Sequence, residues 1–463
     1  MAVTALCNAS QRLAPLLAVT FLVLLSGCGA APPPAGGPVV LVVVDTLRPD
    51  HLGLYGHSRD TSPELDAWAQ AGRVYERAWS TSSWTLPSVA SLFTGRLPSA
   101  HGAVAVLPLP RENPLFGRLP DAIPTLAERF SRAGYATAAF VTNPYLKPLL
   151  GLDRGFDVYD YAAASQSPGR RADSMVERAL SWIDTSSQRP FFLLLHLIDP
   201  HMDYAAPPPQ RGRFTQGETS RLELPVASAS SLREGRFPKP AGGAPLGPED
   251  WSFVSAAYDE EIAFVDAQLG RLRRGLEKRG ILERGIVAFT ADHGEEFFEH
   301  GGFEHGHSLH EEVVRVPLVF WGAGVRAGRE RAPVSLADVA DTLLEGAGLS
   351  APEGSQGVSL WPNLSRGEPI AERTLHFQDV LYGEDRRGAV RWPWKAVVSD
   401  ATGSQYWNLE EDPGEQVLPT GKIPPPVARL LVEIQAQGHT GNAEATALDH
   451  ETRQELEALG YLE

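Results

Sequence analysis

Carboxylate and imidazole side chains directly follow three runs of apolar residues in this chain: Asp45 after residues 38–44, Asp199 and His201 after residues 191–198, and Asp292-His293 after residues 285–291. Such runs are typical of strands buried on both faces of a parallel sheet. Open α/β sheets bind ligands at the carboxyl ends of strands, and oxygen and imidazole ligands suit Zn²⁺, Mn²⁺ or Ca²⁺. Metal binding is therefore the favoured role for the Asp292-His293 pair. For Asp45 alone, capping of the following turn is an equal alternative.

Thr85 carries a hydroxyl group that could act as a nucleophile. Pro87 suits the first turn of a helix, because its missing N–H would find no partner there, and Gly95 suits the helix end. Thr85 then lies just before a helix N-terminus, where free N–H groups and the helix dipole favour anionic oxygen. From this stretch alone the favoured interpretation is an N-cap, a role that threonine fills well.

The elements around these residues alternate between helices and strands. Thr61-Ser62-Pro63 opens a helix with an N-cap and a proline in the first turn. Residues 123–133 and 251–278 are predicted to be helices, and residues 136–141 a short buried strand. This alternation predicts a doubly wound α/β architecture. Residues 204–250 are polar and interrupted by proline and glycine, so we interpret them as a flexible lid or rim.

The remaining histidines have structural interpretations. His196 lies inside the apolar run 191–198, and we interpret it as a core histidine with satisfied hydrogen bonds. Five histidines occur from His293 to His310. Of these, His300 and His310 are interpreted as members of a solvated loop.

The N-terminus is predicted to direct export and lipid attachment. Residues 1–28 combine Arg12, an apolar run and a Leu25-Ser26-Gly27-Cys28 end, which is typical of a lipoprotein signal peptide cleaved before Cys28. Residues 29–38 are rich in proline and glycine and are interpreted as a tether. We therefore expect a lipid-anchored protein of the bacterial cell envelope, at the outer membrane and facing the periplasm or the exterior.

Charge and cysteine content exclude several classes of function. The net charge of −16 argues against a nucleic-acid partner. An anionic substrate needs a concentrated positive charge, which a metal ion supplies. The two cysteines, Cys7 and Cys28, both lie in the predicted leader, so the mature domain has no disulfide, thiolate metal site or cysteine nucleophile.

Taken together, these segments resemble the sulfatase branch of the alkaline phosphatase superfamily. The matching motifs lie, in the family's order, at residues 44–53, 85–88, 93–96, 199–201, 290–296, 304–312, 316–318 and 406–415. The resemblance implies a catalytic domain over residues 39–365, with an alkaline phosphatase-like, mostly parallel central sheet flanked by helices. It also implies a small C-terminal α+β subdomain over residues 366–463.

The resemblance assigns a role to each matching residue. Thr85 corresponds to the nucleophile, and His201 to a histidine that binds the ester or protonates its leaving group. His305 lies thirteen residues after Asp292, where sulfatases have a substrate-binding lysine. The implied metal ligands are Asp45, Thr85, Asp292 and His293, and the implied substrate-binding residues are Asn143 and His307. A second metal near Asp199, His201 and His305 is the further expectation.

Two departures from the sulfatase motif bear on the substrate. Sulfatases oxidise a cysteine or serine to formylglycine, whereas Thr85 cannot yield that aldehyde, and the motif arginine is replaced by Val89. A threonine nucleophile resembles instead the phosphodiesterases, nucleotide pyrophosphatases and phosphoethanolamine or phosphoglycerol transferases of the superfamily. We therefore expect a metal-dependent hydrolase or transferase of an anionic ester, with phosphoesters favoured. A sulfuric ester hydrolase and a non-catalytic sulfatase-like lipoprotein are the alternatives.

The expected fold makes two further predictions. The carboxylates of Asp45 and Asp292 should lie within about 8 Å of each other, because each ligand bond spans roughly 2 to 2.6 Å. The C-terminal subdomain should contain antiparallel strands, including one over residues 389–398, and helices near residues 426–437 and 449–459.

Overall fold

The computed structural model describes residues 36–106, 115–161, 170–186, 189–220, 222, 247–437 and 445–458. The predicted signal peptide, residues 1–28, and most of the predicted tether lie outside these described residues. Within the described part of the chain, no helix is both long enough and apolar enough to cross a membrane.

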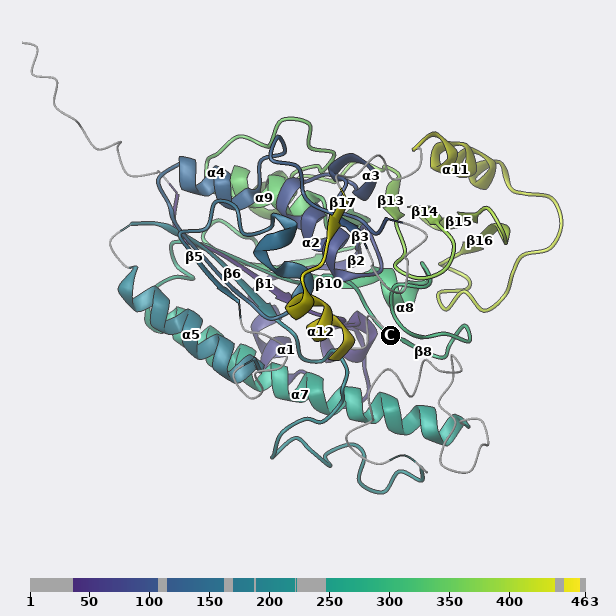
Figure 1. The fold of residues 1–463 in the computed structure, drawn as a ribbon, viewed down its shortest axis with the longest axis horizontal. Helices are drawn as coiled ribbons and strands as arrows, with labels where there is room; N and C mark the ends of the chain where they lie inside the picture. The colour runs from purple at the N-terminus through teal and green to yellow at the C-terminus, as the bar shows by residue number, and fades with distance from the viewer. Residues whose placement is uncertain are drawn as a thin grey trace, which may run out of the picture. The chain divides into compact units, whose positions relative to one another are not determined.

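A central sheet of nine strands organises the described residues (Figure 1). Its strands are β1 (Val39–Val44), β2 (Arg73–Trp79), β4 (Ala136–Val141), β5 (Val158–Tyr161), β6 (Phe191–Leu197), β7 (Ile286–Ala291), β10 (Arg315–Gly322), β11 (Gly328–Glu330) and β12 (Val334–Ser335). Their order is β11-β2-β10-β7-β1-β6-β4-β5, with β12 also paired to β2. Only β10 runs antiparallel to its neighbours among these strands, so the predicted mostly parallel sheet is confirmed.

Helices cover both faces of this sheet (Figure 1). One layer contains α1 (Pro63–Ala69), α5 (Ala172–Thr185) and α7 (Pro248–Lys278), and the other contains α2 (Thr85–Thr94), α4 (Leu126–Arg132) and α9 (Asp338–Gly346). The shorter helices are η1 (Pro49–His51), η2 (Gly53–Tyr55), α3 (Pro98–His101), η3 (Pro144–Leu146), η4 (Pro148–Leu150), α8 (Glu311–Val314) and α10 (Trp361–Arg366). Strand β1 lies between the layers and is buried on both faces, as its unbroken apolar run predicts.

Local signals account for the ends of the predicted helices. Helix α1 has Pro63 at its first position, as predicted. Helix α4 begins later than predicted, because Thr125 forms a capping box: its Oγ1 accepts from Glu128 N at 3.1 Å, and Glu128 Oε2 accepts from Thr125 N at 2.9 Å. Helix α7 begins at Pro248, before the predicted residue 251.

Three parallel strands bring their carboxyl ends together beside β1. Val44 pairs with Leu197 of β6 and with Ala291 of β7, so the residues that follow these strands lie at one edge of the sheet. Asp45, Asp199 and Asp292 are those following residues. The predicted placement of these three carboxylates is confirmed.

The C-terminal unit contains the predicted antiparallel sheet, formed by β13 (Leu375–Gln378), β14 (Arg386–Arg391), β15 (Trp394–Ser399) and β16 (Gly403–Asn408), with α11 (Pro425–Ala436) packed on it. The prediction of a single strand over residues 389–398 is wrong. Arg391 pairs with Trp394 across a turn at Trp392-Pro393, so this range is a hairpin. Proline cannot donate a ladder hydrogen bond, which favours a turn there.

The last described segments return to the catalytic domain. Strand β17 (Ala445–Ala447) pairs with β3 (Leu115–Gly117), and α12 (His450–Ala458) lies against η3. Glu455 of α12 forms an ion pair with Lys147 at 3.0 Å. The chain therefore extends past the C-terminal sheet to pack on the larger domain.

The first part of the predicted loop 204–250 is held against α7. Glu260 accepts backbone N–H bonds from Gly212, Phe214 and Thr215, and Glu261 accepts one from Ala205. Residues 221 and 223–246 of the predicted lid lie outside the described residues.

Candidate active site

Thr85 is the first residue of α2 and its side chain does not cap the helix. Trp84 is the N-cap residue, and Pro87 stands two positions inside the helix. The hydroxyl Oγ1 of Thr85 lies 3.3 Å from His293 Nε2 and accepts from Asn143 Nδ2 at 3.1 Å. The N-cap interpretation of Thr85 is therefore wrong, because its hydroxyl is directed to side chains from other strands.

Asp45, Asp292 and His293 meet beside this hydroxyl. One ligand atom of each lies within 4.8 Å of the others, which agrees with the expected limit of 8 Å. His293 Nε2 is 3.6 Å from Asp45 Oδ1 and 3.5 Å from Asp292 Oδ2. All three side chains are fully buried.

Hydrogen bonds occupy the other atoms of these side chains. Asn143 Nδ2 donates to Asp45 Oδ2 at 2.7 Å, and the backbone N–H of His293 donates to Asp292 Oδ1 at 2.9 Å. His293 Nδ1 donates to the carbonyl of Gly294 at 3.0 Å, so in the neutral ring Nε2 carries the lone pair. Asp45 Oδ1 and Asp292 Oδ2 are buried without a hydrogen-bond partner. Two orphaned oxygens and one imidazole nitrogen thus face the same position, which fits a divalent cation.

The electrostatics of the carboxylate pair agree with this fit. Burial and the neighbouring Asp292 carboxylate raise the pKa of Asp45 well above its usual value. Two buried carboxylates that face each other cannot both ionise cheaply without a nearby positive charge. A divalent cation between them supplies that charge.

His196 lies at the same carboxylates and was misinterpreted as a core histidine with satisfied hydrogen bonds. Its Nε2 is 3.9 Å from Asp45 Oδ2 and 3.9 Å from Asp292 Oδ2, and neither ring nitrogen has a hydrogen-bond partner. The signal was in the strand register: His196 pairs with Val43, two residues before Asp45. Because side chains alternate across a strand, residues two apart face the same side of the sheet.

His305 and His201 continue from His293 as a row of imidazole rings. The ring centroids of His293 and His305 are 4.4 Å apart, and those of His305 and His201 are 5.2 Å apart. Glu295 orients His305, since His305 Nδ1 lies 2.9 Å from Glu295 Oε1, and Tyr204 donates to the other oxygen at 3.1 Å. Burial raises the pKa of Glu295 to about 8. The sequence prediction did not include Glu295 as a site residue.

His201 is held in one orientation by its own backbone neighbour. Its Nδ1 lies 2.9 Å from the carbonyl oxygen of Met202, to which it donates. Burial and the nearby His305 lower the pKa of His201 well below its usual value. The ring therefore has a fixed tautomer and lies next to His305.

The second metal expected near Asp199, His201 and His305 finds no support in the structure. Asp199 Oδ2 accepts from Ala172 N at 2.8 Å, at the start of α5. Burial raises the pKa of Asp199 to about 6. Among the described residues, the groups of three closely spaced ligands do not include these side chains.

The two residues predicted to bind substrate have different surroundings. Asn143 bridges Asp45 and Thr85, as described above. His307 instead follows the short hairpin β8 (Glu296–Phe297) and β9 (Phe303–Glu304), and its Nε2 lies 2.8 Å from Glu296 Oε2. Its ring is oriented by this carboxylate, which comes from the hairpin and not from the residues around Thr85.

The interpretation of His300 and His310 as solvated is wrong. Their rings stack at a centroid distance of 3.7 Å, and both side chains are mostly buried. His300 Nε2 lies 3.3 Å from Glu312 Oε1, and His310 Nδ1 lies 3.1 Å from Glu415 Oε2. A contact from the C-terminal unit, distant in sequence, thus removes His310 from solvent.

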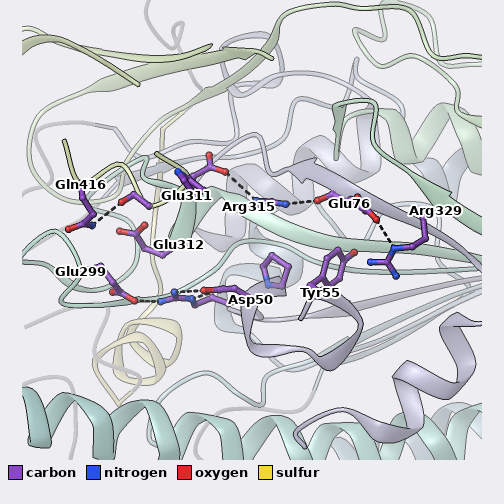
Figure 2. A pocket seen from close by; sticks show the side chains of 13 residues that line it. Asp50, Tyr55, Glu76, Glu299, Glu311, Glu312, Arg315, Arg329 and Gln416 are labelled. Atoms are coloured by element: carbon purple, nitrogen blue, oxygen red, sulfur yellow. Dashed lines mark hydrogen bonds and ion pairs between the residues drawn. The ribbon is translucent and has the colours of Figure 1, made fainter. Parts of the chain in front are cut away.

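A separate cavity of about 520 Å³ is shown in Figure 2. Its lining includes five carboxylates and three arginines: Asp50, Glu76, Glu299, Glu311, Glu312, Arg48, Arg315 and Arg329. Each arginine is already paired, Arg48 with Asp50 and Glu299, Arg329 with Glu76, and Arg315 with Glu311. None of the described residues that line it is a predicted site residue, and its excess of carboxylates does not suit an anionic ester.

Comparison with known proteins identifies the family. The sulfatase family model matches residues 38–349, which is more than half of the chain. The chain therefore belongs to the sulfatase family, and its fold is that of a sulfatase-like ester hydrolase of the alkaline phosphatase superfamily. The expected family is confirmed.

Relatives and solved structures cover most of the chain. A Delta 4,5-hexuronate-2-O-sulfatase of Bacteroides thetaiotaomicron is 23% identical over 432 residues, covering 85% of this chain and 86% of that protein. A structure described as bound to its substrate D-glucosamine-2-N,6-O-disulfate has a TM-score of 0.72 at 18% identity, covering 88% and 97% of the two chains. A phosphonate monoester hydrolase of Agrobacterium radiobacter has a TM-score of 0.67 at 21% identity, covering 87% and 96%.

Proposed function

We propose that this chain is a divalent-metal-dependent phosphoester hydrolase or phosphotransferase in which Thr85 is the nucleophile. The observation that carries the proposal is the placement of Thr85 Oγ1, 3.3 Å from His293 Nε2 and beside the orphaned oxygens of Asp45 and Asp292. Asp45, Asp292 and His293 would hold the metal. When bound there, a divalent cation lowers the pKa of a nearby hydroxyl and screens the charge of an anionic ester.

The other residues orient the reaction. Asn143 donates to both Thr85 and Asp45, which fixes the hydroxyl relative to the carboxylate. The N-terminal N–H groups of α2 favour an anionic ester oxygen. Thr85 Oγ1 attacks phosphorus, the bond to the leaving alcohol breaks, and the proton released by Thr85 passes to that alcohol through His305, whose ring lies next to that of His293. Water, or an acceptor alcohol, then takes the phosphoryl group from Thr85.

Three observations favour a phosphoester over a sulfate ester. A sulfated threonine lacks the hydrate collapse by which formylglycine expels sulfate. Val89, at the motif position of arginine, is fully buried on α2 and offers no charge to an anion. The phosphonate monoester hydrolase shows that this fold accepts phosphorus chemistry. The sulfatases among the relatives favour sulfate as the second candidate, and one fold can host both reactions.

Replacement of the nucleophile tests the proposal. Thr85→Ala should lower turnover at least a thousandfold with little change in stability, because Thr85 does not cap α2. Thr85→Ser should retain part of the activity. Thr94→Ala is the matched control, since Thr94 lies on the same helix and its Oγ1 contacts the carbonyl of Ala90 and the backbone N–H of Arg96. A near-normal rate in Thr85→Ala would contradict the assignment.

A substrate panel distinguishes the two esters. The aryl phosphate or the bis-aryl phosphate should be turned over at least tenfold faster than the aryl sulfate, or about 1.4 kcal/mol in barrier. An aryl sulfate equal to or better than both phosphates would make the protein a sulfuric ester hydrolase despite Thr85. Lack of turnover of all three by metal-loaded protein would favour the non-catalytic alternative.

We further propose that the protein is anchored to the cell envelope through a lipid on Cys28. The support is the sequence Leu25-Ser26-Gly27-Cys28 at the end of an apolar leader. Cys28→Ser should move the protein from the membrane fraction to the soluble fraction. Unchanged membrane association in this variant would contradict the proposal.

A further inference from the structure

We propose that a short segment of the C-terminal unit, residues 378–382 between β13 and β14, positions both Thr85 and His305 for the reaction. Asp379 holds the Thr85 side of the site, and two backbone N–H groups of the segment hold the His305 side. The inference rests on the proposed function, in which Thr85 is the nucleophile and His305 carries the proton. It adds the residues that position the two groups.

The first support is a set of hydrogen bonds from the segment to the residues directly before the nucleophile. Trp84, the N-cap residue of α2, donates from its indole Nε1 to Asp379 Oδ2 at 2.9 Å. Ser82 Oγ donates to the carbonyl of Asp379 at 2.8 Å, and the backbone N–H of Gln378 donates to the carbonyl of Thr81 at 2.8 Å. All three of the leading residues are fully buried. These bonds therefore fix the place at which α2 begins.

The second support is a pair of hydrogen bonds to the residue directly after His305. The backbone N–H groups of Leu381 and Tyr382 both donate to the carbonyl of Gly306, at 2.7 and 2.8 Å. Gly306 has a φ of +77°, and a Cβ atom there would lie 3.0 Å from Leu381 Cβ, so glycine permits this close approach. The segment therefore fixes the backbone that carries the His305 ring.

The two contacts act on side chains that must meet for the proton to be transferred. Thr85 Oγ1 lies 3.3 Å from His293 Nε2, and the ring centroids of His293 and His305 lie 4.4 Å apart. Thr85 and His305 are distant in the sequence, yet one segment bonds the neighbours of both. A misplacement of about 1 Å at a reacting group costs on the order of a hundredfold in rate. Contacts that hold both backbones to one segment therefore affect turnover through geometry.

Attachment of the C-terminal unit is the alternative role for these bonds, and other contacts already supply it. Lys395 forms an ion pair with Glu311 at 2.9 Å, and Trp79 Nε1 donates to the same carboxylate at 2.8 Å. An apolar cluster also joins this unit to the catalytic domain, and it includes Trp79, Leu309, Val313, Phe377 and Val380. Neither set of contacts involves the residues on either side of the nucleophile.

Kinetics of Trp84→Phe in the full chain test the Thr85 side. Loss of the indole N–H should lower kcat at least tenfold with little change in KM, for whichever ester of the panel the wild type turns over. Asp379→Ala should do the same, and Asp379→Asn should restore most of the rate. Burial raises the pKa of Asp379 well above its usual value and so favours a neutral carboxyl, which asparagine resembles. Asparagine also tolerates the φ of 66° at this position.

Trp79→Phe is the matched control for Trp84→Phe. Both indoles are buried and donate to a carboxylate, at 2.8 Å from Trp79 and at 2.9 Å from Trp84. Thermal unfolding should show that both variants are destabilised, whereas kcat should fall only in Trp84→Phe. Equal loss of kcat in the two variants would reduce the Asp379 contact to a structural one and overturn the inference.

Gly306→Ala tests the His305 side. Displacement of His305 should slow turnover of phenyl phosphate at least tenfold more than that of 4-nitrophenyl phosphate, because the poorer leaving group depends more on a proton. Trp84→Phe should slow both esters alike. Gly301→Ala is the matched control: this glycine of the same hairpin also has positive φ, but a Cβ there meets no atom within 4 Å. Its ratio of the two rates should equal that of the wild type.

The outcomes separate this inference from the proposed function. Folded Trp84→Phe and Gly306→Ala variants with wild-type kinetics would overturn the positioning role and leave the Thr85 mechanism intact. A wild type without ester turnover, or a near-normal rate in Thr85→Ala, would overturn the proposed function itself. If Gly306→Ala does not fold, the comparison of Trp84→Phe with Trp79→Phe decides.

Discussion

Two clusters of histidine and aspartate among the described residues have the composition of a metal site but differ in their hydrogen bonds. The catalytic cluster, so called after the proposed function, consists of Asp45, Asp292 and His293, and the Asp259 cluster consists of His51, His57 and Asp259. Each places its ligand atoms within 4.8 Å of one another. Their hydrogen bonds differ.

In the Asp259 cluster both carboxylate oxygens are occupied. His51 Nδ1 lies 2.6 Å from Asp259 Oδ1, while His57 Nε2 and Arg59 Nη1 lie 3.1 and 2.8 Å from Oδ2. These hydrogen bonds and charges lower the pKa of Asp259 against the opposing effect of burial. An arginine beside one carboxylate already supplies a positive charge, so this cluster is a structural ion-pair network.

In the catalytic cluster one oxygen of each carboxylate lacks a hydrogen bond, and no arginine among the described residues pairs with either carboxylate. Asp45 Oδ1 and Asp292 Oδ2 have no partner, and the pKa of Asp45 is raised. Unsatisfied buried oxygens, more than ligand composition, therefore indicate a cation site. The group of His300, His310 and Glu415 resembles the Asp259 cluster, since Lys395 lies 2.8 Å from Glu415 Oε1.

The largest expected effect is that of Asp292→Asn. Replacing one carboxylate of the catalytic cluster should lower bound metal to less than a tenth of the wild-type content and turnover at least a thousandfold, about 4 kcal/mol in barrier. Elemental analysis and kinetics measure the two effects. Folding should persist, because relief of the repulsion between the carboxylates offsets lost hydrogen bonds. Full metal content in this variant would remove the distinction between the clusters.

Asp259→Asn is expected to have a smaller effect, on stability rather than on metal binding or turnover. The change leaves Arg59 opposite a neutral amide and should lower the free energy of unfolding by about 3 kcal/mol, as measured by denaturant titration. Bound metal should remain at the wild-type level. Loss of metal in this variant, with folding intact, would show that the two clusters are not chemically distinct.

The smallest expected effect is the change with pH in the unfolding free-energy difference between wild type and Asp259→Asn. Because the folded-state pKa of Asp259 is lowered, its stabilising contribution is present above the unfolded value of about 3.9 and is lost as pH falls below it. The difference in unfolding free energy between wild type and Asp259→Asn should therefore shrink from pH 6 to pH 3. A difference that grows toward pH 3 would contradict the ionised state of Asp259.

The sequence predicted those parts of the site whose pattern lies within one continuous segment of the chain. Apolar runs ending in Asp45, Asp199 and Asp292 predicted three adjacent strand ends, and the motif around Thr85 predicted a helix there. The failures share one cause. The interpretation of His196 as a satisfied core histidine and of Thr85 as an N-cap each used one segment alone, whereas the contacts of both side chains come from residues distant in sequence.

The amino-acid sequence by itself determined the family, the mostly parallel sheet and the edge at which the carboxylates gather, because each unbroken apolar run and the polar residue that ends it are consecutive in the chain. Only the tertiary structure decided which polar atoms find partners. Asp259 meets Arg59 across 200 positions of the chain, whereas Asp45 and Asp292 meet each other and His196. Hydrogen-bond satisfaction depends on such long-range contacts, and it separates an ion-pair network from a site that binds a metal.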